Sequence, residues 1–205
     1  MQSLLQIDDL SVDFVNNQGT TNALMNISCQ VAKGEVVAIV GESGSGKSVT
    51  SLSILQLLQT PPAVYRSGKI LFNDNGAVID LLQYSKKQME AIRGNRIAMI
   101  FQEPMTSLNP VKTCGGQVAE AMVLHKKISA AVAKKNTLAL FEQVKLPNPA
   151  ALFKRYPHQL SGGQKQRVMI AMAMSCNPDL LICDEPTTAL DVTVQKNILD
   201  LVKML

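Results

Sequence analysis

The sequence has few of the residues that build metal sites or disulfide frameworks. It contains two histidines, His125 and His158, which lie far apart. Its four cysteines are Cys29, Cys114, Cys176 and Cys183. Because no Cys-x-x-Cys pair occurs and the histidines do not cluster with the thiols, a structural zinc site is not expected. Scattered, reduced thiols are typical of cytoplasmic proteins. We expect the cysteines to be small apolar residues of the protein's core.

Long apolar runs and a strong charge imbalance are also missing. The longest uninterrupted apolar run, Val168–Met174, is far shorter than the roughly 20 residues that cross a bilayer. The opening MQSLLQIDD lacks the basic region of a secretory signal. The net charge of +4 is too small to indicate a nucleic-acid partner. With 46% hydrophobic and 18% charged residues, we expect a soluble globular protein whose lysine pairs lie on solvated faces.

The length of 205 residues fits one domain, with room for a subdomain. Three short apolar runs predict buried parallel strands: Val36–Val40, Ile97–Phe101 and Leu180–Cys183. The residues that follow these runs are Gly41, Gln102 and the pair Asp184–Glu185. In open α/β sheets, ligands bind beyond the carboxyl ends of the strands. Three such ends therefore predict one shared site.

Other patterns place the remaining elements. Leu4–Phe14 and Gly68–Phe72 are typical of β structure. Apolar spacing predicts a helix over Lys47–Gln59, and two more near Gly116–Lys126 and Ser129–Val144. The last two would form a helical insertion between strands of the sheet. Apolar spacing predicts a further amphipathic helix over Asp191–Leu205. Because the sequence stops within this helical pattern, we expect it to be a piece cut from a larger protein.

The strongest chemical motif is GESGSGKS, which matches G-x-x-x-x-G-K-[ST] in full. Glycines let successive backbone N–H groups turn inward around phosphate oxygens. The lysine reaches the β- and γ-phosphates, the serine ligates Mg²⁺, and the following helix adds its positive end. A chance glycine turn is the alternative, but the apolar strand before it and the helix after it favour a nucleoside triphosphate. The residues concerned are Gly41, Glu42, Ser43, Gly44, Ser45, Gly46, Lys47, Ser48 and Val49.

Two acidic residues, Asp184 and Glu185, end the third apolar run. Adjacent carboxylates at the end of a buried strand need a cation or water beside them. We expect Asp184 to hold Mg²⁺ through water and Glu185 to act on the attacking water as base or orienter. An exposed acidic turn before Pro186 is the alternative.

A second glycine-rich segment, LSGGQ, covers Leu160–Gln164 and precedes a helical pattern. Ser161 is a good N-cap, and Gly162 and Gly163 leave backbone amides uncovered. The segment is either a plain capped helix start or, because the chain already has one phosphate loop, a surface for a nucleotide on another subunit. Its contact residues would be Ser161, Gly162, Gly163 and Gln164.

Together these motifs, with Gln102 after a strand and Ala189–Leu190–Asp191, resemble the ATP-binding cassette (ABC) ATPases. The resemblance implies a parallel-sheet P-loop NTPase core with an N-terminal antiparallel β subdomain and a helical insertion. It implies ATP and Mg²⁺ as ligands. It also implies that Gln102 senses Mg²⁺ and a membrane partner, that Asp191 joins two sites, and that Phe14 stacks on adenine. The core would comprise residues 1–102 and 160–205, with residues 103–159 as the helical subdomain.

Three segments, FQEPMTSLNP, RYPHQLSGG and DEPTTALDVTVQ, are similar in sequence to those of the ATPase subunits that serve importers of oligopeptides, dipeptides, nickel and glutathione. That likeness implies a head-to-tail pair of ATPase domains on transmembrane permease subunits fed by a solute-binding protein, at the cytoplasmic face of the inner membrane. The family's switch histidine would follow Asp191, whereas His125 and His158 precede Asp184, so we expect an incomplete, poorly active cassette. A soluble ABC ATPase acting on nucleic acid or ribosomes, and a small-molecule kinase, are the alternatives.

Overall fold

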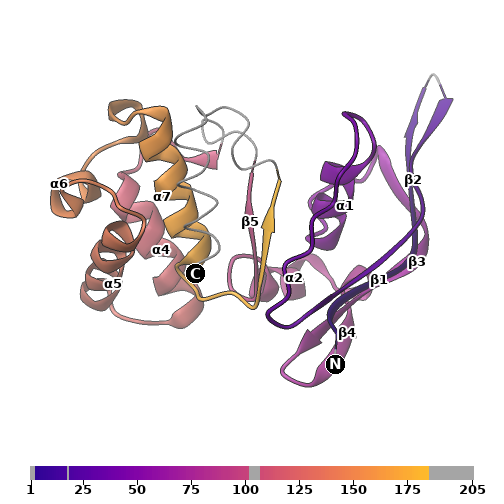
Figure 1. Cartoon of the computed structure of the whole chain (residues 1–205), viewed down its shortest axis with the longest axis horizontal. Helices are drawn as coiled ribbons and strands as arrows, with labels where there is room; N and C mark the ends of the chain where they lie inside the picture. Colours follow the sequence, from indigo (N-terminus) through magenta and orange to yellow (C-terminus); the bar gives the residue numbers. More distant parts are fainter. Residues whose placement is uncertain (1–2, 18, 102–106, 185–205) are drawn as a thin grey trace. The chain divides into compact units, whose positions relative to one another are not determined.

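The computed structural model describes residues 3–17, 19–101 and 107–184 (Figure 1). The chain divides into two compact units, Met1–Glu90 and Ala91–Leu205, and each is described by itself. Among the described residues, no helix is both long and apolar enough to cross a membrane.

The first unit is built on a four-stranded antiparallel sheet in the order β2-β1-β3-β4. Its strands are β1 (Ser3–Asn16), β2 (Gly19–Ala32), β3 (Ala63–Asp74) and β4 (Ala77–Asp80). Leu10, Ile70 and Phe72 are fully buried. Gly68 lies so close to β1 that a Cβ there would be 2.5 Å from the Cα of Leu10. The β structure predicted over 4–14 and 68–72 is confirmed, with longer strands.

One helix of the first unit, α1 (Lys47–Ile54), begins where the sequence predicts and ends five residues early. Gln56 takes a left-handed backbone conformation (φ 48°), which ends the helix. Its side-chain amide donates to the backbone carbonyls of Leu81 and Tyr84. The short helices η1 (Leu81–Gln83) and α2 (Lys86–Ile92) follow the sheet.

The strand predicted over Val36–Val40 is wrong for this structure. The described part of the first unit has no strand there, and Val36 and Val40 are 87% and 91% exposed. The chain leaves β2 through a turn in which the Glu35 carboxylate accepts from the backbone N–H of Ala32 at 2.7 Å. A strand needs a neighbour for its backbone hydrogen bonds. The apolar pattern of this run predicts burial, but it does not predict which strand would pair with it.

The second unit contains the other two predicted strands, β5 (Ile97–Ile100) and β6 (Leu180–Cys183), paired in parallel. Their register runs from Ile97 opposite Leu180 to Ile100 opposite Cys183. Arg96 and Asp179 fix the start of this register: the guanidinium of Arg96 pairs with the Asp179 carboxylate, and the Arg96 carbonyl accepts from the Asp179 N–H at 2.8 Å. The parallel orientation predicted for these two strands is confirmed. Their predicted burial is confirmed for β5 and wrong for β6, whose residues are half-buried or, at Cys183, exposed.

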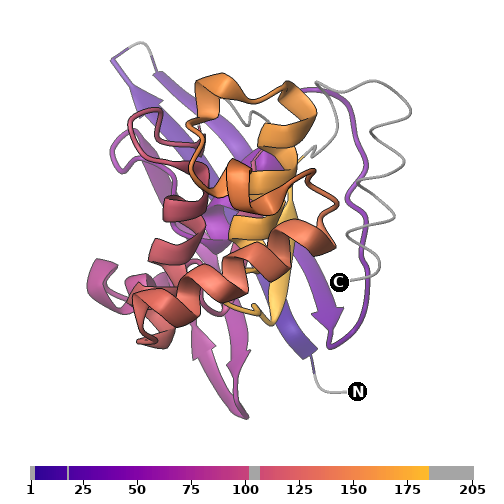
Figure 2. The same cartoon turned by 90° about the vertical axis from the view of Figure 1, so that its left-hand side faces the viewer.

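The other regular elements in the described part of the second unit are helices, and Figure 2 looks onto them. They are α4 (Cys114–Lys126), α5 (Ala130–Gln143), α6 (Pro149–Phe153), η2 (Pro157–Gln159) and α7 (Gly162–Met174). Thr113 caps α4 and Ser129 caps α5 through their side chains, so both predicted helices are confirmed. A shared core joins α4, α5 and α7 and includes Val118, Phe141, Met169 and Ile170. The predicted helix over Asp191–Leu205 lies outside the described residues.

The four cysteines are free thiols with unequal burial. Cys114 and Cys176 are fully buried, which confirms their expected core role. Cys29 is half-buried, and Cys183 is exposed, so the expectation of a core role is wrong for Cys183. Cys183 is the last residue of the four-residue strand β6. The apolar run predicts burial for all of its residues and does not distinguish the residue at the strand end.

Candidate functional site

The loop Gly41–Gly46 leads directly into α1 in the first unit. Gly44 and Gly46 have left-handed backbone conformations (φ 82° and 92°), which glycine adopts without steric strain. Gly46 also approaches β2 closely: a Cβ there would be 2.6 Å from Cδ2 of Leu24 and 3.1 Å from the Ala23 carbonyl oxygen. Two independent reasons therefore require glycine at position 46: its left-handed backbone conformation and the lack of space for a Cβ beside β2.

Lys47 turns back over this loop. Its ammonium donates to the backbone carbonyls of Gly41 and Glu42, each at 2.9 Å. Gly46, the N-cap of α1, supplies no side-chain acceptor to the first turn. An uncapped helix end with a cation beside it is an arrangement that suits phosphate oxygens. Ser48 and Val49 are half-buried in that same first turn.

Phe14 lies near the end of β1, between Thr21 of β2 and Ala63 of β3. Its ring is half-buried. The residue before it, Asp13, accepts hydrogen bonds from Arg66 at 2.7 Å and Asn22 at 2.8 Å. The bond from Arg66, followed by that from Asn22, lowers the pKa of the Asp13 carboxyl. The strand end that carries Phe14 is thus held on both sides.

Asp184 directly follows β6 in the second unit. Its backbone N–H donates to the Ile100 carbonyl at 3.0 Å, so the parallel ladder continues to this residue. The half-buried side chain therefore stands at the carboxyl end of the strand pair, the edge at which α/β sheets bind ligands. Glu185, Gln102 and Asp191 lie outside the described residues.

The second glycine-rich segment caps its own helix. The Ser161 hydroxyl accepts from the Gln164 N–H at 3.4 Å, and the Gln164 side chain accepts from the Ser161 N–H at 3.2 Å. This reciprocal pair is a capping box. Ser161 and Gly162 are exposed, and a Cβ on Gly162 would meet no atom within 4 Å. The N-cap prediction for Ser161 is confirmed, and the start of α7 faces open space in the described structure.

The predicted site residues fall into two sets. Phe14 and Gly41–Val49 belong to the first unit, whereas Asp184 and Ser161–Gln164 belong to the second. Because each unit is described by itself, the single site expected at the strand ends stays a prediction. Sequence reasoning missed Ala23 and Leu24, which lie against Gly46 of this loop. They are ordinary apolar residues some twenty positions upstream and belong to no motif, so the glycine at position 46 is the signal that could have pointed to them.

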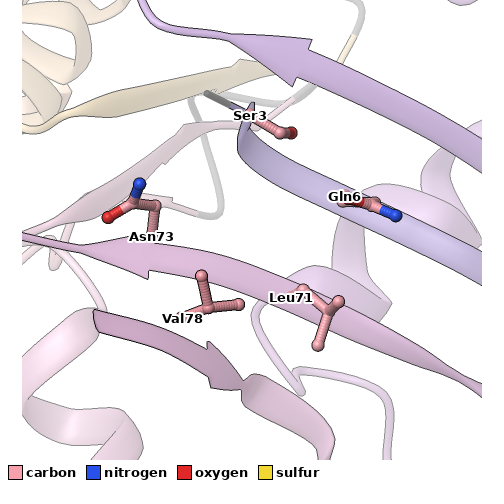
Figure 3. A pocket seen from close by; sticks show the side chains of 5 residues that line it. All are labelled: Ser3, Gln6, Leu71, Asn73 and Val78. Atoms are coloured by element: carbon pink, nitrogen blue, oxygen red, sulfur yellow. The ribbon is translucent and has the colours of Figure 1, made fainter. Parts of the chain in front are cut away.

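A pocket of about 180 Å³ lies elsewhere, against β1, β3 and β4 (Figure 3). Its lining residues are Ser3, Gln6, Leu71, Asn73 and Val78. None of them is titratable, and none is a predicted site residue. The lining has no cationic and no acid–base side chain, so this pocket is not a candidate active site.

The match to a protein-family model shows to which family the chain belongs. The ABC transporter family model matches residues 24–188. The chain belongs to the ABC transporter family. That match covers the phosphate loop, the LSGGQ segment and Asp184, the three motifs located above.

Curated members of the ABC transporter family match almost the whole chain. It is 50% identical to the dipeptide transport ATP-binding protein DppD of Bacillus subtilis, over 99% of this chain and 59% of DppD. It is 49% identical to the oligopeptide transport protein OppD of the same organism, over 98% of this chain and 55% of OppD. The glutathione import protein GsiA of Salmonella choleraesuis is 50% identical, over 100% of this chain and 33% of GsiA. The chain thus spans less than two thirds of these relatives.

Solved structures of ABC cassettes have the same fold. A dimeric post-hydrolysis state of the ATP-binding cassette MJ0796, bound to ADP and phosphate, superposes with a TM-score of 0.83 at 27% identity, covering 97% of this chain and 81% of that one. The cassette cbiO1 of Clostridium perfringens gives 0.76 at 29% identity, covering 100% and 74%. The fold class predicted from the sequence, a P-loop ABC ATPase with β and helical subdomains, is confirmed.

Proposed function

We propose that the complete protein binds and hydrolyses ATP with Mg²⁺ and powers the import of a peptide-like solute. The observation that carries this proposal is the loop Gly41–Gly46, in which two left-handed glycines and an uncapped helix end stand beside the Lys47 ammonium. Backbone N–H groups and one fixed cation are the donors that a triphosphate needs.

The residues present fit Mg-ATP. Gly41–Ser48 and Val49 would hold the phosphates, and Phe14 would stack on the adenine. The hydroxyl of Ser48, the amide oxygen of Gln102 and the carboxylate of Asp184 are hard oxygen donors, which suit Mg²⁺. Glu185 would orient the attacking water and take its proton, and the bound cation would neutralise charge on the phosphates.

The exposed start of α7 supports a second copy as partner. Ser161–Gln164 would close over a nucleotide held by the other ATPase domain, with Asp191 linking the two sites. The solved structure of the relative MJ0796 is dimeric, which supports this arrangement. We propose that the pair docks on transmembrane permease subunits, served by a solute-binding protein, at the cytoplasmic face of the inner membrane. Residues 103–159 would be the helical subdomain, between core segments 1–102 and 160–205.

The cargo class follows from the names of the relatives. Dipeptides, oligopeptides and glutathione all contain amide-linked amino acids, and the chain is about equally similar to importers of all three. A peptide-like solute is the class they share. These relatives are all transport proteins by name, so they give no support to an ATPase acting on nucleic acid or ribosomes.

The test uses the full-length protein assembled with its membrane subunits. Glu185→Gln keeps the shape of the side chain and removes its basicity, so ATP binding should persist while turnover collapses. Dipeptides, a pentapeptide and glutathione, each with the solute-binding protein, should be compared for stimulation of ATP hydrolysis. Hydrolysis by Glu185→Gln at the parent rate would remove that residue from the mechanism. Stimulation by RNA or DNA, and by none of the peptides, would favour the soluble ATPase instead.

A further inference from the structure

Gly115, in the first turn of α4, is pressed against the ring of Phe153 from α6. A Cβ on Gly115 would lie 2.2 Å from Cδ2, 2.3 Å from Cγ and 2.7 Å from Cε2 of that ring. Glycine in a helix is ordinarily unfavourable by roughly 0.5–1 kcal/mol relative to alanine. Gly115 lies within the regular helix, and its φ is not in the left-handed region. The close approach of Phe153 is therefore the physical reason for a glycine at this position.

Two further contacts hold the same junction. The backbone N–H of Cys114, which is fully buried, donates to the carbonyl of Arg155 at 2.8 Å. The Lys134 ammonium lies over the Phe153 ring, 5.7 Å from its centroid, within the range of a cation–π contact. The first contact fixes the residues after α6 to the first turn of α4, and the second restrains the Phe153 ring from α5.

The chain from this junction to α7 is short and internally bonded. The backbone N–H of Tyr156 donates to the side chain of Gln159 at 2.9 Å, and the N–H of Leu160 donates to the Pro157 carbonyl at 3.1 Å. Leu160 is 6% exposed and belongs to the core shared by α4, α5 and α7. The proline and the 3-10 turn leave little freedom to absorb a shift before Ser161. A displacement of Arg155 therefore reaches the N-cap of α7.

We propose that Gly115 is a positioning residue for Ser161–Gln164, acting through Phe153 and Arg155. This inference rests on the proposed function, in which that segment closes over a nucleotide held by the other ATPase domain. A methyl group on Gly115 would have to move the ring from 2.2 Å to ordinary contact beyond 3.4 Å, a shift of about 1 Å. A misplacement of about 1 Å at a reacting centre reduces rates by about 100-fold.

The expected effect separates turnover from binding. The phosphate loop belongs to the first unit, whereas Gly115 and Ser161 belong to the second. Gly115→Ala should therefore lower the kcat for ATP hydrolysis by roughly 10- to 100-fold. The Kd for Mg-ATP should stay within about twofold of the parent, because the loop that holds the phosphates is unchanged. Amide hydrogen exchange over residues 160–164 should be faster in the variant.

The experiment compares five full-length proteins assembled with their membrane subunits: the parent, Gly115→Ala, Gly116→Ala, Phe153→Ala and the double variant Gly115→Ala/Phe153→Ala. Gly116→Ala is the matched control, because its methyl group would press on the Thr113 hydroxyl, the cap of α4, at 2.7 Å and so disturb the same helix start without touching Phe153. The double variant Gly115→Ala/Phe153→Ala removes the clash. Adding the methyl group to the Phe153→Ala protein should then change kcat by less than about twofold, although it lowers the parent's kcat by at least about tenfold.

A parent that neither binds nor hydrolyses ATP would refute the proposed function. A working parent with equal kcat and equal exchange in Gly115→Ala would refute the positioning role alone. The role would also fail if Gly115→Ala and Gly116→Ala behaved alike, or if the methyl group lowered kcat as much in the Phe153→Ala protein as in the parent. Should Gly115→Ala not fold, Phe153→Ala decides: lower kcat, unchanged Kd and faster exchange over 160–164 support the role, and parental values overturn it.

Discussion

The phosphate loop Gly41–Lys47 and the segment Leu160–Gln164 are both glycine-rich and both lead into a helix, yet their helix ends differ. Gly46 caps α1 with a left-handed backbone and no side chain. Ser161 caps α7 with an extended backbone and a hydroxyl, in a reciprocal pair with Gln164. One helix end lacks a side-chain acceptor for its first-turn donors, and the other supplies its own.

This difference assigns the two segments different tasks. The end of α1 has no side-chain cap at Gly46 and stands beside the Lys47 ammonium, an arrangement that suits a bound anion. The end of α7 is stable without a ligand because its cap is complete, and it can stand exposed as a surface. The first is suited to hold a nucleotide, and the second to contact one held elsewhere.

The largest expected effect comes from removing the cation of the first segment. Lys47→Ala in the full-length protein deletes the ammonium that bonds to the Gly41 and Glu42 carbonyls and that would face the phosphates. A charged hydrogen bond contributes roughly 1.5–3 kcal/mol. We expect ATP affinity to fall by about tenfold or more in isothermal titration. Lys47→Arg, which keeps the charge, should lose less; equal affinity in parent and Lys47→Ala would refute the assignment.

The next effect separates backbone strain from steric clash in the same loop. Gly46→Ala forces a left-handed conformation that is unfavourable by roughly 1–2 kcal/mol for other residues, and also drives a methyl group into Leu24. Gly44→Ala has the strain alone, since a Cβ there meets nothing within 4 Å. Urea unfolding should therefore show a larger loss of stability for Gly46→Ala than for Gly44→Ala. Equal losses would mean that β2 does not shape the loop.

How far the sequence predicts this molecule is best seen in two apolar runs of similar composition. Ile97–Ile100 is fully buried and pairs with Leu180–Cys183, as predicted. Val36–Val40 lies largely exposed and forms no strand within the described residues. Apolar composition predicts that a segment will be buried. Whether the segment forms a strand depends on which other strand lies beside it, and that strand can be far away in the sequence.

The site follows the same rule. The phosphate loop, the start of α1 and the Ser161 cap were predictable because each depends on residues within a few positions. The contacts of Gly46 with Leu24 and of Gly115 with Phe153 were not, because each joins residues more than twenty positions apart and only the glycine marks it. Local chemistry is visible in the sequence, and close packing between elements is not.

A smaller effect tests the cap of the second segment. Ser161→Ala removes the hydroxyl that accepts from the Gln164 N–H, and loss of an N-cap lowers stability by about 1 kcal/mol. Ser161→Asn, which restores a capping oxygen, should recover most of that stability in thermal unfolding. In the monomeric state ATP affinity should be unchanged in both, because Ser161 would contact only a nucleotide that the other ATPase domain holds. A loss of affinity would contradict the separation of tasks between the two segments.

The smallest change in stability, and one of opposite sign, is expected for Gly162→Ala. Gly162 opens α7 without a left-handed φ, and a Cβ there meets no atom within 4 Å, so alanine fits the folded chain. Replacing a helical glycine with alanine stabilises by at most about 1 kcal/mol. Thermal unfolding should therefore occur at the parental temperature or slightly above it. A clear fall in stability would mean that the surface of α7 is not open. If the more stable variant hydrolyses ATP more slowly than the parent, the glycine serves the approach of the other domain's nucleotide, since no described residue of its own chain lies close enough to require it.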